Sequence, residues 1–349
     1  MITSTAIPKK WVVRDYHKSV EEELSKALRI SKITSRILVH RGIKTVDTVR
    51  KFLNPQLADF HDPFLLYGMK EACSLIRQAI DKNSRMLVYG DYDVDGVTST
   101  VLVLKLIRLL GGDVIYYVPN RLQEGYGLSR RGIDFANDEH VKLLITVDCG
   151  ITAVREVEYA NRLGIKTIII DHHLPEKNIP EQCVIVNPKQ PKCVYPFKDL
   201  CGVGLALKLS QAFLGIKDRF LDLAAFGTVA DIVPLVDENR IIVTLGLRQM
   251  NQTANLGLQE LVQVSSLAGK FLVPHHIGFV LGPRVNAAGR LGDARWGIEL
   301  LLSENKEEAA RLAQKLDEEN NSRKKIEFCV LEDAIKKIQE GYDFDKNSI

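Results

Sequence analysis

The sequence lacks the features of a membrane protein or a disulfide-bonded secreted protein. No apolar run approaches the roughly 20 residues that cross a bilayer. The first residues, MITSTAIPKKW, lack the apolar stretch of a secretory signal. The six cysteines form no C-x-x-C pair, so a structural zinc site is not expected. These absences predict a cytoplasmic protein with reduced thiols and no membrane association.

The sequence also lacks a strong charge of one sign. Its formal net charge is +3, which indicates only a weak preference for anionic partners and does not identify the partner. Hydrophobic residues make up 46% and charged residues 26% of the chain, as in ordinary globular proteins. Its 349 residues are enough for two domains. No internal repeat or low-complexity tract interrupts it.

The chain reads as three parts. Residues 1–75 are predicted to be a helical and connecting extension, with no catalytic signature and a packing role. Residues 76–303 carry acidic motifs at the ends of predicted strands and form the predicted catalytic domain. From residue 304 to about 339 the pattern predicts one long helix, followed by a polar tail to residue 349. The middle of that helix, residues 317–325, is almost wholly polar, as in helices that are solvated or connect domains.

Short apolar runs alternate with helical patterns in the central part. Strands are expected at residues 86–89, 114–118, 143–147 and 166–170. Helices are expected at 97–110 and 152–163, and further along at 202–214 and 220–230. This alternation predicts an α/β fold with a mainly parallel sheet flanked by helices.

Acidic residues and histidines follow three of these strands directly, and one more aspartate follows the helix at 220–230. Because the carboxyl ends of parallel strands meet at one edge of the sheet, these side chains are expected to converge there. They are Asp91, Asp93, Asp95, Asp148, Asp171, His172, His173 and Asp231.

Such a cluster points to metal chemistry. Carboxylates this close together repel one another, and a divalent cation removes the repulsion. Oxygen ligands suit Mg²⁺, and an added imidazole shifts the preference toward Mn²⁺. Each motif alone has a simpler explanation as a helix cap or core pair; their joint placement predicts a site for two ions that share a carboxylate and hydrolyse a phosphoester. The predicted ligands are Asp93, Asp95, Asp148, His172 and Asp231, with Asp91 adjacent.

Two roles stay open for His173, the second histidine of the triplet. It can bind the scissile phosphate or act as a general acid for the leaving oxygen. It can instead support a neighbouring ligand.

Seven segments, in order, resemble the DHH phosphoesterase superfamily and, within it, the RecJ family. The resemblance covers roughly residues 60 to 340. It implies a DHH phosphoesterase lobe that uses two Mn²⁺ or Mg²⁺ ions to degrade single-stranded DNA from its 5′ end to mononucleotides. It also implies work in DNA repair and recombination, beside a helicase and a single-strand-binding protein. The segments are GDYDVDGVTSTVLV, PNRLQEGYGLS, ITVDCGI, IIDHHLP, CGVGLALKL, FGTVADIVPL and GPRVNAAGRLGDA.

The resemblance assigns roles to individual residues. It makes Asp148 the carboxylate that bridges the two ions, with a catalytic role, and His173 the catalytic group that meets the substrate or leaving oxygen. Many members have a histidine where this chain has Tyr89, so one ion is expected to have a thinner ligand shell, helped by Asp91. The remaining ligands are Asp93, Asp95, His172 and Asp231.

The same resemblance indicates substrate contacts. Arg284, Asn286 and Arg290 match positions around the terminal phosphate or nearby backbone, and a guanidinium grips a phosphate bidentately. Arg284 has the alternative of an ion pair at a domain interface. Arg121 is a further expected contact with the strand. Tyr126 can stack on a base or have a packing role.

The resemblance ends at the long helix. RecJ proteins continue into a second domain and an OB-fold, neither of which is visible here, so the chain resembles an N-terminal lobe with the start of a missing second domain. Two alternatives therefore stay open. One is a phosphoesterase of small substrates such as short oligonucleotides, cyclic dinucleotides or pyrophosphate; the other is a non-catalytic scaffold of the same fold.

Overall fold

The computed structural model describes residue 12 and residues 18–340. The first residues of the predicted extension and the polar tail at 341–349 lie outside the described residues. The chain divides into two compact units, Met1–Gln56 and Leu57–Ile349. The second unit begins earlier than residue 76, at which the sequence places the start of the catalytic domain.

Within its described residues, the first unit contains three short amphipathic helices, α1 (Lys18–Leu28), α2 (Lys32–His40) and α3 (Val46–Leu53). The side chain of Ser31 caps α2 and that of Thr45 caps α3, which fixes where each helix begins. The helices bury a small core of their own, made of Leu24, Leu38, Val39 and Val49.

The second unit is built on a parallel sheet of five strands, counted within the described residues, in the order β2-β1-β3-β4-β5. The predicted α/β fold is confirmed. The strands are β1 (Met86–Tyr89), β2 (Val114–Tyr117), β3 (Leu143–Val147), β4 (Lys166–Ile170) and β5 (Val184–Val186). The strand β5 has only three residues, too few to show a periodicity, and the sequence did not predict it.

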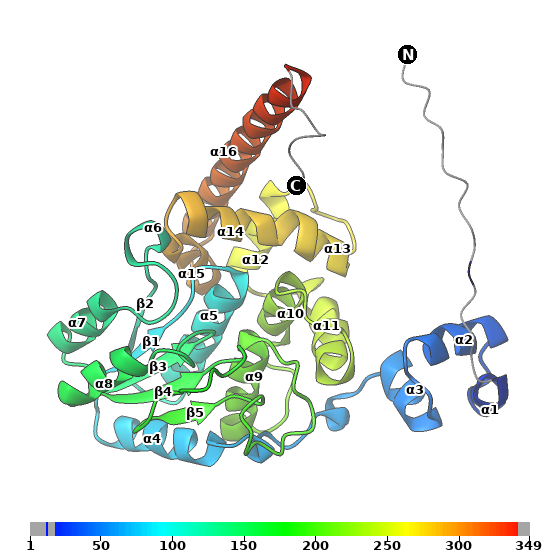
Figure 1. Ribbon diagram of the computed structural model, residues 1–349, viewed down its shortest axis with the longest axis horizontal. Helices are drawn as coiled ribbons and strands as arrows, with labels where there is room; N and C mark the ends of the chain where they lie inside the picture. The colour runs from blue at the N-terminus through cyan, green and yellow to red at the C-terminus, as the bar shows by residue number, and fades with distance from the viewer. Residues whose placement is uncertain (1–11, 13–17, 341–349) are drawn as a thin grey trace. The chain divides into compact units, whose positions relative to one another are not determined.

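The strands are apolar on both sides because helices cover both faces of the sheet (Figure 1). Met86 and Val88 point into a core shared with α5 (Val94–Leu109), α9 (Gly202–Leu214) and α10 (Leu221–Ala230). Leu87 and Tyr89 point into a second core with α7 (Arg130–Asp138) and α8 (Val154–Arg162).

Other helices complete the second unit. The sequence assigned no element between residues 231 and 303, where the structure has α11 to α15. These and the earlier helices are η1 (Leu57–Asp59), η2 (Pro63–Leu65), α4 (Met69–Asp81), α6 (Arg121–Glu124), α11 (Asp237–Met250), α12 (Leu256–Val264), α13 (Pro274–His276), the π-helical η3 (Ile277–Leu281), α14 (Gly282–Leu291) and α15 (Arg295–Leu302).

The predicted long helix is α16 (Lys306–Gln339). Its first half buries Leu312 and Leu316, and Asn320 in its polar middle is buried too, so that middle is not wholly solvated. Its second half projects beyond α14 and α15 (Figure 1) and leaves Phe328 and Leu331 exposed. None of the described helices combines the length and apolarity needed to cross a membrane.

The topology fixes where a site can form. From β1 the chain moves to β2 on one side and later to β3 on the other, so the strand order reverses between β1 and β3. Loops that leave the carboxyl ends of two such strands diverge and open a crevice between them. Asp91 follows β1 and Asp148 follows β3, which places both carboxylates at this crevice.

Candidate metal centre

The first acidic segment is shaped by the start of α5. Asp93 is the N-cap, and its side chain accepts a hydrogen bond from the Gly96 amide at 3.1 Å. The helix therefore begins at Val94, three residues before the predicted start at 97, and Asp95 lies in its first turn. Asp91 is buried in the loop before it, where burial and then the charge of Asp93 raise the pKa of Asp91 to about 7.

Asp95 also stabilises a second helix. Its two carboxylate oxygens accept hydrogen bonds from the amides of Gly202 and Val203 at 2.6 and 2.8 Å, at the N-terminus of α9. Free amides and the helix dipole favour an anion there. Burial, followed by the charge of Asp231, nevertheless raises the pKa of Asp95 well above its ordinary value. The carboxylate is thus fixed in position and surrounded by negative charge.

Asp148 follows β3 in the left-handed backbone region, with φ of +60°. An aspartate tolerates this region better than most residues. A Cβ atom at Gly202 would lie 2.7 Å from the Asp148 Cβ, so only glycine allows α9 to come this close. Burial and then the charge of Asp95 raise the pKa of Asp148 well above its usual range.

His172 lies among three carboxylates from three different elements. Its Nε2 atom is 3.1 Å from Asp148 Oδ1, 3.8 Å from Asp231 Oδ2 and 3.9 Å from Asp95 Oδ2. Burial is the main reason that the pKa of His172 falls to about 4. The imidazole is therefore neutral near pH 7, which is the form that binds a metal ion.

Asp231 completes the cluster from the end of α10, where it is the C-cap. Burial and then the charge of Asp93 raise its pKa to about 6. The structure thus brings together all six of the predicted ligands, although they come from sequence positions as far apart as 91 and 231.

The donor atoms fit a pair of hard divalent cations. Asp91, Asp93 and Asp148 offer atoms within 4.8 Å of one another, and so do Asp148, His172 and His173, so that Asp148 is common to both groups. Three buried oxygens find no hydrogen-bond donor among the described residues: Asp91 Oδ1, Asp148 Oδ1 and Asp231 Oδ2. Asp148 Oδ1 lies close to His172 Nε2 but does not accept a hydrogen bond from it. Buried carboxylate oxygens without a donor are costly, and a cation would satisfy them.

One residue of this cluster was not predicted. Cys201 lies with Asp95 and Asp231 in a third group within reach of one ion, and its thiol contacts the Thr228 hydroxyl at 3.4 Å. Its place in CGVGLALKL gave no signal, because a cysteine before a buried helix is usually a packing residue.

His173 is oriented by two neighbours. Its Nδ1 atom lies 2.7 Å from Asp171 Oδ1, and the Tyr126 hydroxyl lies 3.3 Å from its Nε2 atom. The hydrogen bond to Asp171 is the largest cause of the raised pKa of His173. Against the effect of burial, that bond lowers the pKa of Asp171. Tyr126 also donates to the backbone oxygen of Asp148 at 3.3 Å, so this tyrosine belongs to the centre itself.

The segment GPRVNAAGR packs against the first acidic loop. Asn286 Oδ1 accepts a hydrogen bond from the Val94 amide at 3.0 Å, and a Cβ at Gly289 would lie 2.2 Å from the Tyr92 carbonyl oxygen. Arg284 is buried instead in an ion pair with Asp317 of α16 at 2.8 Å and donates to the Val280 carbonyl. The ion pair that the sequence left open as an alternative for Arg284 is therefore present.

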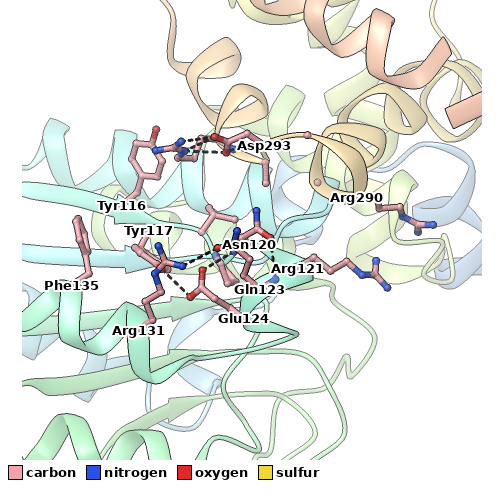
Figure 2. A pocket seen from close by; sticks show the side chains of 16 residues that line it. Tyr116, Tyr117, Asn120, Arg121, Gln123, Glu124, Arg131, Phe135, Arg290 and Asp293 are labelled. Carbon is pink, nitrogen blue, oxygen red and sulfur yellow. Dashed lines mark hydrogen bonds and ion pairs between the residues drawn. The ribbon is translucent and has the colours of Figure 1, made fainter. Parts of the chain in front are cut away.

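Arg121 and Arg290 are exposed beside the centre. The Arg121 guanidinium lies 5.0 Å from the ring centre of Tyr92, and the charges of both arginines act on the Tyr92 hydroxyl. Both line a cleft of about 510 Å³ between β2, α6 and the end of α14. Figure 2 shows the two side chains extending toward the same side, whereas Arg131 is turned toward Gln123, with which it hydrogen-bonds at 3.0 Å.

Comparison with known proteins gives relatives over nearly the whole chain. Residues 85–228 match the model of the DHH family, N-terminal domain. The chain is 43% identical to the single-stranded-DNA-specific exonuclease RecJ of Bacillus subtilis over 336 residues, which are 96% of this chain and 43% of that protein. The chain spans about half the length of the curated relatives it matches.

Solved structures of RecJ are among those similar to this chain. The crystal structure of RecJ from Thermus thermophilus in complex with Mn²⁺ matches with a TM-score of 0.77 and 31% identity, over 90% of this chain and 46% of that one. A crystal structure of exonuclease RecJ bound to manganese matches with a TM-score of 0.72 and 34% identity, over 78% of this chain and 70% of that one.

Proposed function

The chain belongs to the RecJ family of DHH phosphoesterases, and on that premise we propose that it is a metal-dependent exonuclease that releases mononucleotides from the 5′ end of single-stranded DNA. The observation that carries the proposal is the cluster at the crevice between β1 and β3. Buried carboxylates and one neutral imidazole converge there, and three carboxylate oxygens find no donor among the described residues.

The donor set suits two Mn²⁺ or Mg²⁺ ions. One would be held by Asp91, Asp93 and Asp148, and the other by Asp95, His172 and Asp231 together with Asp148. When bound, such a pair supplies an activated water and neutralises charge on the phosphate. The chain's own contribution is to fix these side chains in advance: Asp93 caps α5, and Asp95 is held by the amides of α9.

We assign His173 the contact with the reacting phosphate. Its Nδ1 atom is tied to Asp171, which fixes the ring and leaves Nε2 as the atom that can meet a substrate. Near Nε2 lies the Tyr126 hydroxyl, a second polar group that can bind a phosphate oxygen. A proton on Nε2 would be donated to the leaving oxygen.

The strand would be held by exposed cations next to the centre. Arg121 and Arg290 are exposed near Tyr92 and extend toward the same side, where they would contact phosphates of the strand. Asn286 and Arg284 act indirectly. Asn286 holds the first turn of α5, and Arg284 attaches α14 to α16.

We propose the wider setting by analogy with the family. We place the enzyme in DNA repair and recombination in the cytoplasm, supplied with single strands by a helicase and acting beside a single-strand-binding protein. Within the chain, residues 76–303 would be the catalytic lobe, 1–75 an extension, and 304–349 a connection to a second lobe.

A substrate comparison tests the proposal. The chain is incubated in Mn²⁺ with 5′-labelled single-stranded DNA, with the same DNA as a duplex, and with a dinucleotide. Release of labelled mononucleotides from the single strand alone is the expected result. Cleavage of the dinucleotide alone would contradict the proposal and indicate a phosphoesterase of small substrates. Cleavage of none of the three would indicate a scaffold or an incomplete enzyme.

A further inference from the structure

Ile232 has a conformation that its residue type disfavours. It directly follows Asp231, and its backbone φ is +61°, in the left-handed region. Its side chain is 87% exposed. Among the described residues with positive φ other than glycine, Ile232 is the one β-branched residue; the others are Arg29, Asn83, His140, Asp148, Gln182, Phe220, Asp237 and Ser266.

The left-handed backbone and the exposed apolar side chain both cost free energy. Contacts within the described chain compensate little of this cost. The left-handed region brings the Cβ of a β-branched residue too close to its own backbone, and glycine or asparagine would avoid this. Because the side chain stays exposed, it gains almost no stabilisation from the hydrophobic effect. Exposure alone is ordinary: Leu174 and Val194 are 75% and 77% exposed, but neither has a positive φ. The combination at Ile232 points to a partner outside the chain.

The position of Ile232 indicates which partner. The preceding Asp231 has its Oδ2 atom 3.8 Å from His172 Nε2, so Ile232 lies directly beside the metal centre. The Ile232 amide still donates to the Val229 carbonyl at 3.3 Å, so residue 232 lies in the turn that directly follows α10 and its C-cap Asp231. The left-handed backbone there ends the helix and turns the side chain out to solvent next to the ligand.

We propose that Ile232 is a substrate contact, whose side chain packs against the deoxyribose or base of the nucleotide at the centre. This rests on the proposed function. Apart from Tyr126, the groups described at the centre bind phosphates and metal ions through charge or polar contacts and do not recognise the apolar face of a nucleotide. An exposed aliphatic side chain supplies that contact without preference for one base, as removal of successive nucleotides requires.

Substitutions that separate the side chain from the backbone test this. Ile232→Gly keeps the left-handed conformation and removes the contact, while Ile232→Val keeps most of the contact. Val194→Gly is the matched control, an exposed β-branched residue in a loop outside the centre. For each variant, KM and kcat are measured in Mn²⁺ on a 5′-phosphorylated single-stranded oligonucleotide of about ten nucleotides. Mn²⁺ affinity is measured separately by titration calorimetry, and stability by thermal unfolding.

For Ile232→Gly we expect KM to rise on the order of ten-fold, because one apolar contact with the substrate is lost. Its kcat, Mn²⁺ affinity and thermal midpoint should be equal to or above those of the wild type, since glycine relieves the strain. Ile232→Val should have a KM close to that of the wild type, and Val194→Gly should leave the wild-type KM unchanged.

Two results would overturn the inference. One is an unchanged KM in Ile232→Gly; the other is a fall in its Mn²⁺ affinity that accounts for the change in KM, since Ile232 would then act by placing Asp231. Both presuppose a wild-type chain that cleaves the oligonucleotide. A wild-type chain that binds Mn²⁺ but neither binds nor cleaves it would overturn the proposed function itself, and the inference with it.

Discussion

The side-chain oxygen of Asn286 accepts a hydrogen bond from the backbone amide of Val94 at 3.0 Å. This bond joins α14 to the first turn of α5, between Asp93 and Asp95. A helix has unsatisfied amides in its first turn, and here Asp93 satisfies that of Gly96 while Asn286 satisfies that of Val94. The placement of two predicted metal ligands therefore depends on a residue almost two hundred positions away in the sequence.

Replacing Asn286 with alanine should weaken the metal centre as well as the fold. We expect a loss of about 1 kcal/mol in the free energy of unfolding, because the Val94 amide loses its acceptor. Mn²⁺ affinity should fall about ten-fold, as for other residues that orient ligands. Urea unfolding and Mn²⁺ titration measure the two effects. Asn161→Ala, which removes a long, exposed hydrogen bond on α8, is the control and should change neither.

Replacing Arg284 with alanine should act first on stability. Its guanidinium is buried against Asp317, so its removal leaves a half-buried carboxylate without its partner. We expect a loss of about 2 to 3 kcal/mol in the free energy of unfolding, less than for a fully buried pair. Asp317→Ala should cost a similar amount, and the double variant less than the sum. Full stability in Arg284→Ala, together with lost DNA cleavage, would assign this arginine to the substrate instead.

The metal-free chain should be less stable at neutral than at mildly acidic pH. The raised pKa values, about 7 for Asp91 and about 6 for Asp231, and well above 3.8 for Asp95 and Asp148, mean that the folded chain binds protons more tightly than the unfolded chain. This stabilisation is complete below about pH 4 and is lost as pH rises through the folded values. His172, with its pKa lowered to about 4, acts in the opposite direction, and so does Asp171, whose pKa is also lowered; the four carboxylates with raised pKa values outnumber them.

Thermal unfolding in EDTA at about pH 5 and about pH 8 measures this effect. The midpoint should be lower at the higher pH, and excess Mn²⁺ should raise it most there, because the cation replaces the missing protons. A metal-free midpoint that does not fall between these pH values would mean that the carboxylates are not packed as closely as described.

The sequence predicted the sheet and its ligands because both obey local rules. The four longer strands are apolar runs, and parallel strands bring the residues at their carboxyl ends to one place, so Asp148 and His172 could be assigned without coordinates. Strand β5 and helices α11 to α15 were not predicted. A three-residue strand carries too little pattern, and the helices between 231 and 303 are separated by turns that no clear pattern in the sequence marks.

Contacts between residues far apart in the sequence could not be predicted either. The ion pair of Arg284 with Asp317 depends on α16 folding back across α14, which no local pattern encodes. The role of Gly202 depends on how closely α9 approaches Asp148. The left-handed backbone of Ile232 is likewise visible only in three dimensions, since isoleucine is among the residues least expected there.

The most direct test of the account is the number of Mn²⁺ ions bound by the wild type and by Asp148→Ala, measured by titration calorimetry beside hydrolysis of single-stranded DNA. Asp148 belongs to two of the three groups of possible ligands, one with Asp91 and Asp93 and the other with His172 and His173. The wild type should bind two ions per chain, and the variant should lose tight binding at both positions and all hydrolysis. Asp113→Ala, an exposed aspartate paired with Arg85, should bind and cleave as the wild type does. Two tightly bound ions and near-full hydrolysis in Asp148→Ala would contradict a shared carboxylate at the centre.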